Sequence, residues 1–265
     1  MQRVQHLLRL ARNRGSRPLM IKIIGSFVSP YVRKVLACLN LKGLAYEIDP
    51  ITSFYANDEF SKLSPLRRIP VLIDGDVTLS DSSVICAYID EAYPGAALLP
   101  SDPKGRARSR WFEEYADTRL GDLFIWGLFY QKIVHEMVWG EPGDQARIQK
   151  TLNEDLPLAL DYLETELPPS GFLFGELGIA DISIATFFRN GSYAGFDADP
   201  QRWPRTAAFV EHALAHPAFA TLLRFEDVQR SVEIKRRREA LMEAGVSLTT
   251  ETYGTREPRR GIMRL

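Results

Sequence analysis

Apolar and polar residues alternate with two different periods near the start of the chain. Residues 20–26, MIKIIGS, form a short β-branched run that ends in glycine, as buried strands do. Residues 30–42 place apolar side chains on one face at helical spacing, and residues 44–50 alternate up to a proline. This pattern predicts the order β-α-β.

A hairpin and a further helix are predicted next. Residues 67–83, RRIPVLIDGDVTLSDSS, contain two apolar runs around an Asp-Gly pair, which is a strong hairpin signal. A polar segment with a short helical turn precedes them. Residues 81–95 have the spacing of a helix, with Asp81 at its start and Pro94-Gly95 beyond its end. The predicted order over residues 20–94 is therefore β-α-β-α-β-β-α.

The pattern changes after residue 94. Residues 95–103 are rich in proline and glycine, which is typical of a linker. From residue 104 to about residue 216, long helical periods replace the strands. The predicted fold class is α/β followed by all-α, with a small α/β domain at 20–94 and an all-helical domain at 104–225.

Two extensions flank these domains. Residues 1–19 contain five arginines and no acid, which is typical of a transit peptide or a basic interfacial helix, although an upstream start or a frayed arm explains them more simply. Residues 226–265 predict a charged helix followed by a loosely held tail. Their KRRR run at 235–238 is a candidate for binding nucleic acid or anionic lipid, but the flanking glutamates favour a solvated helix face.

The composition is that of an ordinary globular protein. Apolar residues make up 45% of the chain, charged residues 25%, and the net charge is −1, so the strongly basic balance of a nucleic-acid-binding domain is missing. No run approaches the roughly 18 to 20 apolar residues of a membrane span. Cys38 and Cys86 both lie in apolar runs and are expected to be free thiols in a reducing compartment. We expect a cytoplasmic protein that binds neither nucleic acid nor membranes.

Three motifs carry a family resemblance, and they occur in order from about Met20 to Arg224. They are SPYVRKV at 29–35, SPLRRIPVLIDGDVTLSDSSVICAYI at 64–89, and GELGIADISIATFF at 175–188. With them the chain resembles the cytosolic glutathione S-transferase family, in particular its serine-type, bacterial-like members. The resemblance implies a thioredoxin-like domain followed by an all-helical domain.

The resemblance implies a role for the serine at the start of the first helix. Ser29 precedes Pro30, where serine is a favoured helix N-cap. In the family a hydroxyl here contacts the glutathione sulfur, and a donated hydrogen bond at a helix N-terminus favours a thiolate over a thiol of ordinary pKa about 8.5. Ser29 is the first candidate and Ser26 the second, because serine-type classes differ in the offset between hydroxyl and helix. The alternative is that Ser29 only caps the helix and has no role in binding glutathione.

The resemblance also implies how glutathione itself is held. Pro70 is typically cis in this fold, and Ile69 offers its backbone N–H and C=O to the cysteinyl unit. Arg68 is either beside the peptide or a surface cation. Asp81 and Ser82 start a helix and are expected to hold the γ-glutamyl head.

One expected cation is missing. Many members have a lysine or histidine that binds the glycyl carboxylate, whereas residues 53–60 offer Asn57 and no cation. Either Arg67 or Arg68 compensates, or glutathione binds weakly. A second departure is Gly178, which replaces a capping hydroxyl three residues before Asp181, a residue expected to act in folding.

The second substrate is expected between the domains. Tyr31, Trp111 and Tyr115 are the candidate walls of a pocket for a hydrophobic electrophile, with Phe124, Trp126 and Phe129 nearby in sequence; such an aromatic stripe is also typical of helix cores. The four histidines have no metal-ligand spacing, so no metal is expected.

The predicted function is glutathione transfer to a small hydrophobic electrophile by a symmetric homodimer, with the small domain of one chain against the helical domain of the other. The alternative is a catalytically silent, protein-binding regulator resembling stringent starvation protein A, favoured by the missing cation and the basic tail. A thiol-disulfide reductase is disfavoured because no cysteine stands at Ser29 or Val32.

Overall fold

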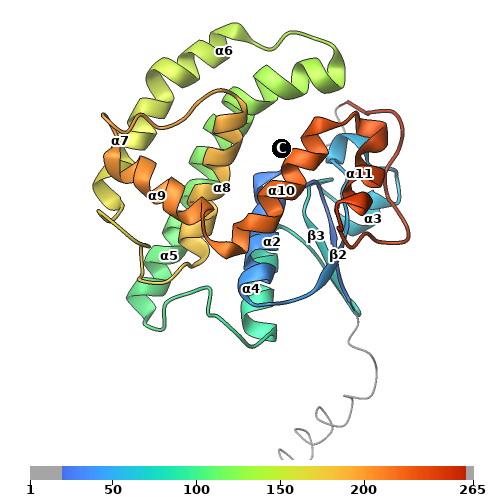
Figure 1. The fold of residues 1–265 in the computed structure, drawn as a ribbon, viewed down its shortest axis with the longest axis horizontal. Coiled ribbons are helices and arrows are strands. Elements are labelled where there is room, and N and C mark those ends of the chain that lie inside the picture. The colour runs from blue at the N-terminus through green and yellow to red at the C-terminus, as the bar shows by residue number, and fades with distance from the viewer. Residues whose placement is uncertain (1–19, 261–265) are drawn as a thin grey trace, which may run out of the picture.

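The computed structural model describes residues 20–260 (Figure 1), so the predictions for residues 1–19 lie outside the described residues. Four strands form one mixed sheet in the order β2-β1-β3-β4, with β1 and β2 parallel and the other pairs antiparallel. The strands are β1 (Ile21–Ile24), β2 (Tyr46–Asp49), β3 (Val71–Asp74) and β4 (Val77–Ser80). The hairpin around Gly75 is confirmed as β3 and β4.

Helices cover this sheet and connect its strands. They are α2 (Pro30–Leu41), η1 (Ser53–Tyr55), α3 (Phe60–Leu63) and α4 (Ser82–Ala92). The apolar face of α2 is fully buried against the sheet, as its periodicity predicts. The β-α-β-α-β-β-α order and the thioredoxin-like arrangement are thereby confirmed.

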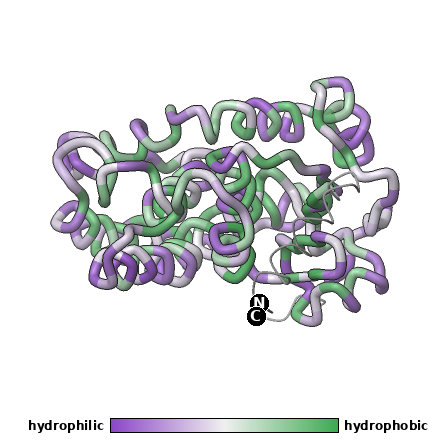
Figure 2. Tube along the Cα trace, turned by 90° about the horizontal axis from the view of Figure 1, so that it is seen from below, coloured by the Kyte–Doolittle hydropathy of each residue, from purple (hydrophilic) through white to green (hydrophobic). Residues whose placement is uncertain are grey.

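Residues 103–231 are mostly helical. Their elements are α5 (Pro103–Tyr115), the π-helical η2 (Ala116–Trp139), α6 (Gln145–Lys150), η3 (Thr151–Asp155), α7 (Leu156–Glu166), α8 (Ile179–Tyr193), α9 (Pro204–Leu214) and α10 (Pro217–Ser231). Helix α5 continues without a break into η2, and α8 is buried along most of its length. Figure 2 shows the hydrophobic residues concentrated in the middle of the trace and the hydrophilic ones on its outward turns. None of the described helices is both long and apolar enough to cross a bilayer.

The start of α8 explains the glycine at its cap. The Asp181 carboxylate accepts hydrogen bonds from Gly178 N at 2.9 Å and from Leu173 N at 2.8 Å. A Cβ on Gly178 would lie 2.9 Å from the carbonyl oxygen of Leu98, and that oxygen accepts from Ile179 N. Because the backbone of Leu98 occupies this space, a capping serine or threonine does not fit.

The C-terminal region corrects one prediction. Helix α10 runs through the expected boundary at 225/226, and η4 (Ile234–Arg236) and α11 (Arg237–Glu243) follow it. The segment beyond them is not loosely held: it pairs with β2 through an Ile48–Leu248 bridge, and Gly254 pairs with Ala56. The free edge of β2 explains this, because Ile48 N donates to Ser247 O at 2.9 Å and Ile48 O accepts from Thr249 N at 3.1 Å. Figure 1 shows this segment folded against β2.

Candidate functional site

Ser29 caps the N-terminus of α2. Its Oγ accepts a hydrogen bond from Val32 N at 3.4 Å, and Pro30 occupies the first helical position. The side chain is half-buried, and within residues 20–260 its hydroxyl donates no hydrogen bond. The structure therefore leaves one hydroxyl proton unused at the positive end of a 12-residue helix.

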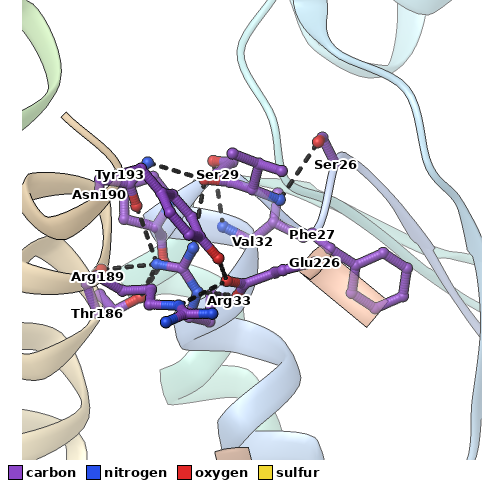
Figure 3. Close-up of polar contacts among 12 residues, drawn as sticks. Ser26, Phe27, Ser29, Val32, Arg33, Thr186, Arg189, Asn190, Tyr193 and Glu226 are labelled. Carbon is purple, nitrogen blue, oxygen red and sulfur yellow. Dashed lines mark hydrogen bonds and ion pairs between the residues drawn. The ribbon is translucent and has the colours of Figure 1, made fainter. Parts of the chain in front are cut away.

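Buried polar side chains fix the position of this helix start (Figure 3). Arg33 is fully buried; it donates to Thr186 O at 2.6 Å and Asn190 Oδ1 at 2.9 Å and forms an ion pair with Glu226. Thr186 Oγ1 in turn donates to Pro30 O at 3.1 Å. The first turn of α2 is thus tied to α8 and α10. The only signal for Arg33 in the sequence is a cation on the apolar face of a helix.

Ser26 lies in the turn between β1 and α2 and does not face solvent. Its side chain is buried, and its Oγ accepts from Val28 N at 3.3 Å and from Gln229 Nε2 at 3.0 Å. Gln229 Oε1 accepts from Phe27 N at 3.1 Å, so one fully buried amide holds both sides of the turn. Of the two candidate serines, Ser29 is the more exposed.

The segment before β3 lies against the same turn. The Ile69–Pro70 peptide bond is cis. A Cβ on Gly25 would lie 2.4 Å from Val32 Cγ2 and 3.3 Å from Ile69 Cβ, so the missing side chain of Gly25 lets Ile69 approach the start of α2. Neither the N–H nor the C=O of Ile69 has a hydrogen-bond partner in the described part of the chain. Arg68 is exposed beside it.

Asp81 and Ser82 stand at the start of α4. Asp81 is the N-cap: its Oδ1 accepts from Ser83 N at 3.0 Å and Val84 N at 3.1 Å. The Asp81 side chain is exposed, whereas Ser82 is buried. Capping uses only one carboxylate oxygen, so the other is free to meet an ammonium group.

Arg67 has a structural role. Its guanidinium is mostly buried and donates to Ala56 O at 2.6 Å, to Asn57 O at 3.0 Å and to the Ser61 hydroxyl. These bonds join the loop after β2 to the segment before β3. Two of the three guanidinium nitrogens are therefore engaged by these groups, while Nε is buried without a partner among the described residues.

Tyr31, on α2, packs against η2 and α8. Its hydroxyl donates to Asp117 O at 3.0 Å, and its ring meets Phe187 edge-on at 5.3 Å. A Cβ on Gly121 would lie only 2.6 Å from this hydroxyl oxygen, so the contact requires glycine. Burial, reinforced by the Asp117 carboxylate, raises the pKa of Tyr31 well above its usual range. The hydroxyl stays protonated at neutral pH.

Trp111 and Tyr115 contact α7. Trp111 Nε1 donates to Tyr162 Oη at 2.8 Å, and Tyr115 Oη donates to Ala159 O at 3.2 Å. The rings of Tyr115 and Tyr162 lie 4.9 Å apart. Tyr31 and Tyr115 pack against the same buried apolar cluster, but among the described residues no ring contact or hydrogen bond joins Tyr31 to Trp111 or Tyr115.

An aromatic cluster joins the far end of η2 to the small domain. It consists of Phe54, Tyr130 and Trp139, with the Phe54 and Trp139 rings 5.5 Å apart and Trp139 Nε1 donating to Tyr130 Oη at 3.2 Å. We call these three residues the interdomain cluster. It could not be predicted from the sequence, because Phe54 is distant along the chain from η2.

Two further observations concern cofactors. Within residues 20–260, no group of three or more His, Cys, Asp or Glu side chains is placed to hold a metal ion. Cys38 and Cys86 are both free and buried. Burial raises the pKa of the Cys86 thiol, so this thiol is not a ready nucleophile.

The sequence matches that of known proteins over most of its length. The family described as "Glutathione S-transferase, N-terminal domain" matches residues 23–97. Glutathione S-transferase 3 of Zea mays is 32% identical over 211 residues, which cover 75% of this chain and 91% of that protein. Glutathione S-transferase U28 of Arabidopsis thaliana is 28% identical, covering 63% of this chain and 71% of that one.

Solved structures agree with these relatives. The crystal structure of a glutathione S-transferase from Rhodospirillum rubrum F11 has a TM-score of 0.71 and 27% identity and covers 77% of this chain and 92% of that chain. The apo structure of glutathione S-transferase III has a TM-score of 0.66 and 29% identity, covering 77% of this chain and 96% of that chain. These matches favour a transferase over the non-catalytic regulator.

Proposed function

The chain belongs to the glutathione S-transferase family of enzymes, and on that premise we propose that Ser29 activates the thiol of glutathione for attack on a small hydrophobic electrophile. The observation that carries the proposal is the unused hydroxyl proton of Ser29 at the N-terminus of α2. A hydrogen bond from this hydroxyl, together with the helix dipole, stabilises a thiolate more than a thiol. The enzyme is thus of the serine type.

The chemistry needs no nucleophile on the protein. The thiol proton leaves to solvent, the thiolate sulfur attacks the electrophilic carbon, and a carbon–sulfur bond forms. With an aryl halide the carbon–halogen bond breaks and the halide leaves with the electron pair. Ser29 lowers the barrier by keeping the sulfur ionised, and Arg33 positions Ser29 through the buried contacts of α2.

The glutathione peptide is held on the small domain. Ile69 pairs with the cysteinyl unit as an added strand, since its backbone groups have no other partner within residues 20–260. The γ-glutamyl ammonium meets the exposed Asp81 carboxylate, and its carboxylate meets Ser82 at the start of α4. Arg68 lies beside the peptide.

The electrophile binds between the start of α2 and η2. Tyr31 forms one wall, and its protonated hydroxyl keeps that wall neutral. The half-buried Phe129, whose ring lies 6.5 Å from that of Tyr193, forms another. We place Trp111 and Tyr115 outside this pocket because their contacts are with α7.

The assembly is a homodimer in the cytoplasm. Large hydrophobic side chains are exposed on both parts of the chain, Leu66 and Val84 on the small domain and Trp111 on α5, which suits a contact between unlike domains of two copies. Two free cysteines suit a reducing compartment.

The test combines calorimetric titration of glutathione with conjugation of chlorodinitrobenzene. Ser29→Ala is expected to bind glutathione but to lower kcat by about 10- to 100-fold, the value of one charge-assisted hydrogen bond. The pH dependence of kcat should move toward the ordinary thiol pKa in Ser29→Ala, and Ser29→Thr, which keeps a hydroxyl, should retain much of the rate.

Three results would change this assignment. If Ser26→Ala loses the rate and Ser29→Ala does not, Ser26 is the thiolate donor. If neither substitution lowers kcat, no serine of this turn activates the thiol. If the wild-type protein binds no glutathione at millimolar concentration, the chain is not a glutathione transferase.

A further inference from the structure

Backbone hydrogen bonds join the loop after β2 to residues 246–259, which we call the C-terminal segment. Asn57 N donates to Tyr253 O at 2.8 Å, and Thr255 N donates to Tyr55 O at 2.6 Å. The two residues between these partners form the isolated β-bridge described above. Three consecutive residues of the loop are therefore paired with the C-terminal segment, which follows all three family motifs in the sequence.

The side chain of Tyr253 packs against an apolar cluster that Ile69 also contacts. The buried members of this cluster are Ile24, Ala56, Phe60 and Val71. Ile69 packs against it from the segment before β3, and the half-buried Tyr253 packs against it from the C-terminal segment. Because protein interiors are close-packed, loss of the Tyr253 ring would let this cluster shift. The C-terminal segment therefore supports the apolar contacts that hold Ile69.

Asp49 joins the C-terminal segment to the turn between β1 and α2. Its backbone oxygen accepts a hydrogen bond from Gly25 N at 2.9 Å, at the first residue of that turn. Its carboxylate accepts from Tyr253 N at 2.7 Å. Gly25 is also the residue whose missing side chain lets Ile69 approach the start of α2. One aspartate thus fixes the C-terminal segment to the turn that Ile69 lies against.

Arg67 connects the paired loop to the residues before β3. Its guanidinium donates to Ala56 O at 2.6 Å and to Asn57 O at 3.0 Å, and both residues belong to the stretch that pairs with the C-terminal segment. Arg67 has a φ of 54°, a conformation that a residue with a side chain keeps only where its neighbours hold it. A displaced loop would therefore also displace the backbone two residues before Ile69.

We propose that the C-terminal segment positions the glutathione-binding edge of the small domain, with Tyr253 as the main positioning residue. It acts through the loop after β2 and Arg67, and it sets where Ile69 presents its backbone groups. An edge that is ordered before binding costs less entropy when a peptide pairs with it. The inference rests on the proposed function, because it concerns the affinity of the same site for glutathione and leaves thiol activation to Ser29.

The first experiment compares Tyr253→Ala, which removes the ring from the cluster, with Tyr253→Phe, which keeps it. Tyr253→Ala is expected to raise both KM and the calorimetric Kd for glutathione by about 3- to 10-fold, because a loosened edge must be ordered on binding. The value of kcat at saturating glutathione and its pH dependence should stay those of the wild type, since Ser29 is unchanged. Tyr253→Phe should restore the wild-type KM.

The second variant, Thr255→Val, weakens the same pairing without opening a cavity. Thr255 Oγ1 donates to Tyr55 O at 3.0 Å, and valine keeps the branched shape and the backbone N–H. We expect KM for glutathione to rise by about 2- to 3-fold. Met242→Ala, at a 62% exposed position on α11, is the control and should leave KM unchanged. Thr255→Val also decides the question if Tyr253→Ala does not fold.

The outcomes separate this inference from the proposed function. If the wild-type protein binds glutathione and neither Tyr253→Ala nor Thr255→Val raises KM, the positioning role is refuted and the transferase stands. A lower kcat at unchanged KM also refutes it, because the segment then supports only the folded fraction. An equal rise of KM in Met242→Ala refutes it too, since the effect does not depend on the loop contacts. If the wild-type protein binds no glutathione, both assignments fail.

Discussion

The guanidinium of Arg33 on α2 and the carboxylate of Glu226 on α10 form an ion pair in which neither side chain is exposed to solvent. Glu226 also accepts from Tyr193 Oη and from Arg189 Nε, the latter at 3.3 Å, so the carboxylate has several donors. Such a pair fixes geometry, because any displacement leaves a buried charge without its partner. The pair thereby sets where the Ser29 hydroxyl stands.

Breaking this pair should be strongly destabilising. Arg33→Met is expected to lower the free energy of unfolding by about 3 to 5 kcal/mol, since it leaves Glu226 buried with one cation fewer. Urea denaturation measures the change. Arg189→Met, which removes the more exposed partner of Glu226, is the control and should cost less. An equal loss in the two variants would show that burial of Arg33 does not matter.

The position of the C-terminal segment after α11 should depend on Asp49. Its buried carboxylate accepts from Tyr253 N at 2.7 Å, Thr252 Oγ1 at 2.8 Å and Arg238 Nη1 at 3.2 Å. Asp49→Leu is expected to cost about 2 to 4 kcal/mol and to expose residues 246–259, because three donors lose their acceptor. Hydrogen exchange of that segment checks the result. Unchanged protection there would mean that the backbone bridge to β2 holds the segment without Asp49.

Stability should fall in mild acid through His216. Its Nδ1 caps α10 by accepting from Ala218 N at 3.2 Å, which requires the neutral ring. Burial and the charge of His212 lower its pKa below the ordinary 6.5, with Glu176 opposing. Below pH about 6.5 the His216 ring is therefore protonated more readily in the unfolded chain than in the folded one. The stabilisation that the neutral His216 cap provides is lost as the pH falls from there through the pKa of the folded state.

His216→Asn tests this, because asparagine caps a helix without titrating. Between pH 7.5 and 5.5 the wild type should lose about 1 kcal/mol more than the variant in urea denaturation, the usual worth of a cap. Equal pH dependence in the two proteins would exclude His216 as the titrating group.

The proposed dimer should depend on Leu66. Leu66 is 49% exposed in the single chain, and Val84 and Trp111 are 51% and 45% exposed. Leu66→Glu is expected to convert dimer to monomer in sedimentation analysis, because it places a charge in an apolar contact. Leu158→Glu on α7, at an apolar position 67% exposed, is the matched control and should leave the dimer intact. If both variants remain dimeric, the interface lies elsewhere.

Periodicity and turn chemistry determined the local structure. The β-branched run before Gly25, the Asp-Gly pair of the hairpin and the Ser29-Pro30 cap each depend on a few adjacent residues, so their elements follow from the sequence alone. Each of the three motifs also consists of adjacent residues, and together they were sufficient to identify the family. The split of the C-terminal region into α10, η4 and α11 did not follow, since its charged residues continue a helical pattern without a clear stop.

Tertiary structure decided which distant residues become partners. The spacing of Trp111 and Tyr115 puts both on one helix face, but only the packing of α7 shows what that face meets. Gln229 reaches Ser26 across 203 positions, and Arg237 reaches the end of η2, because separate elements fold against each other. The reason is physical: a periodic pattern states which side chains are buried, whereas a buried charge or amide takes its role from the donor or acceptor that packing places opposite it.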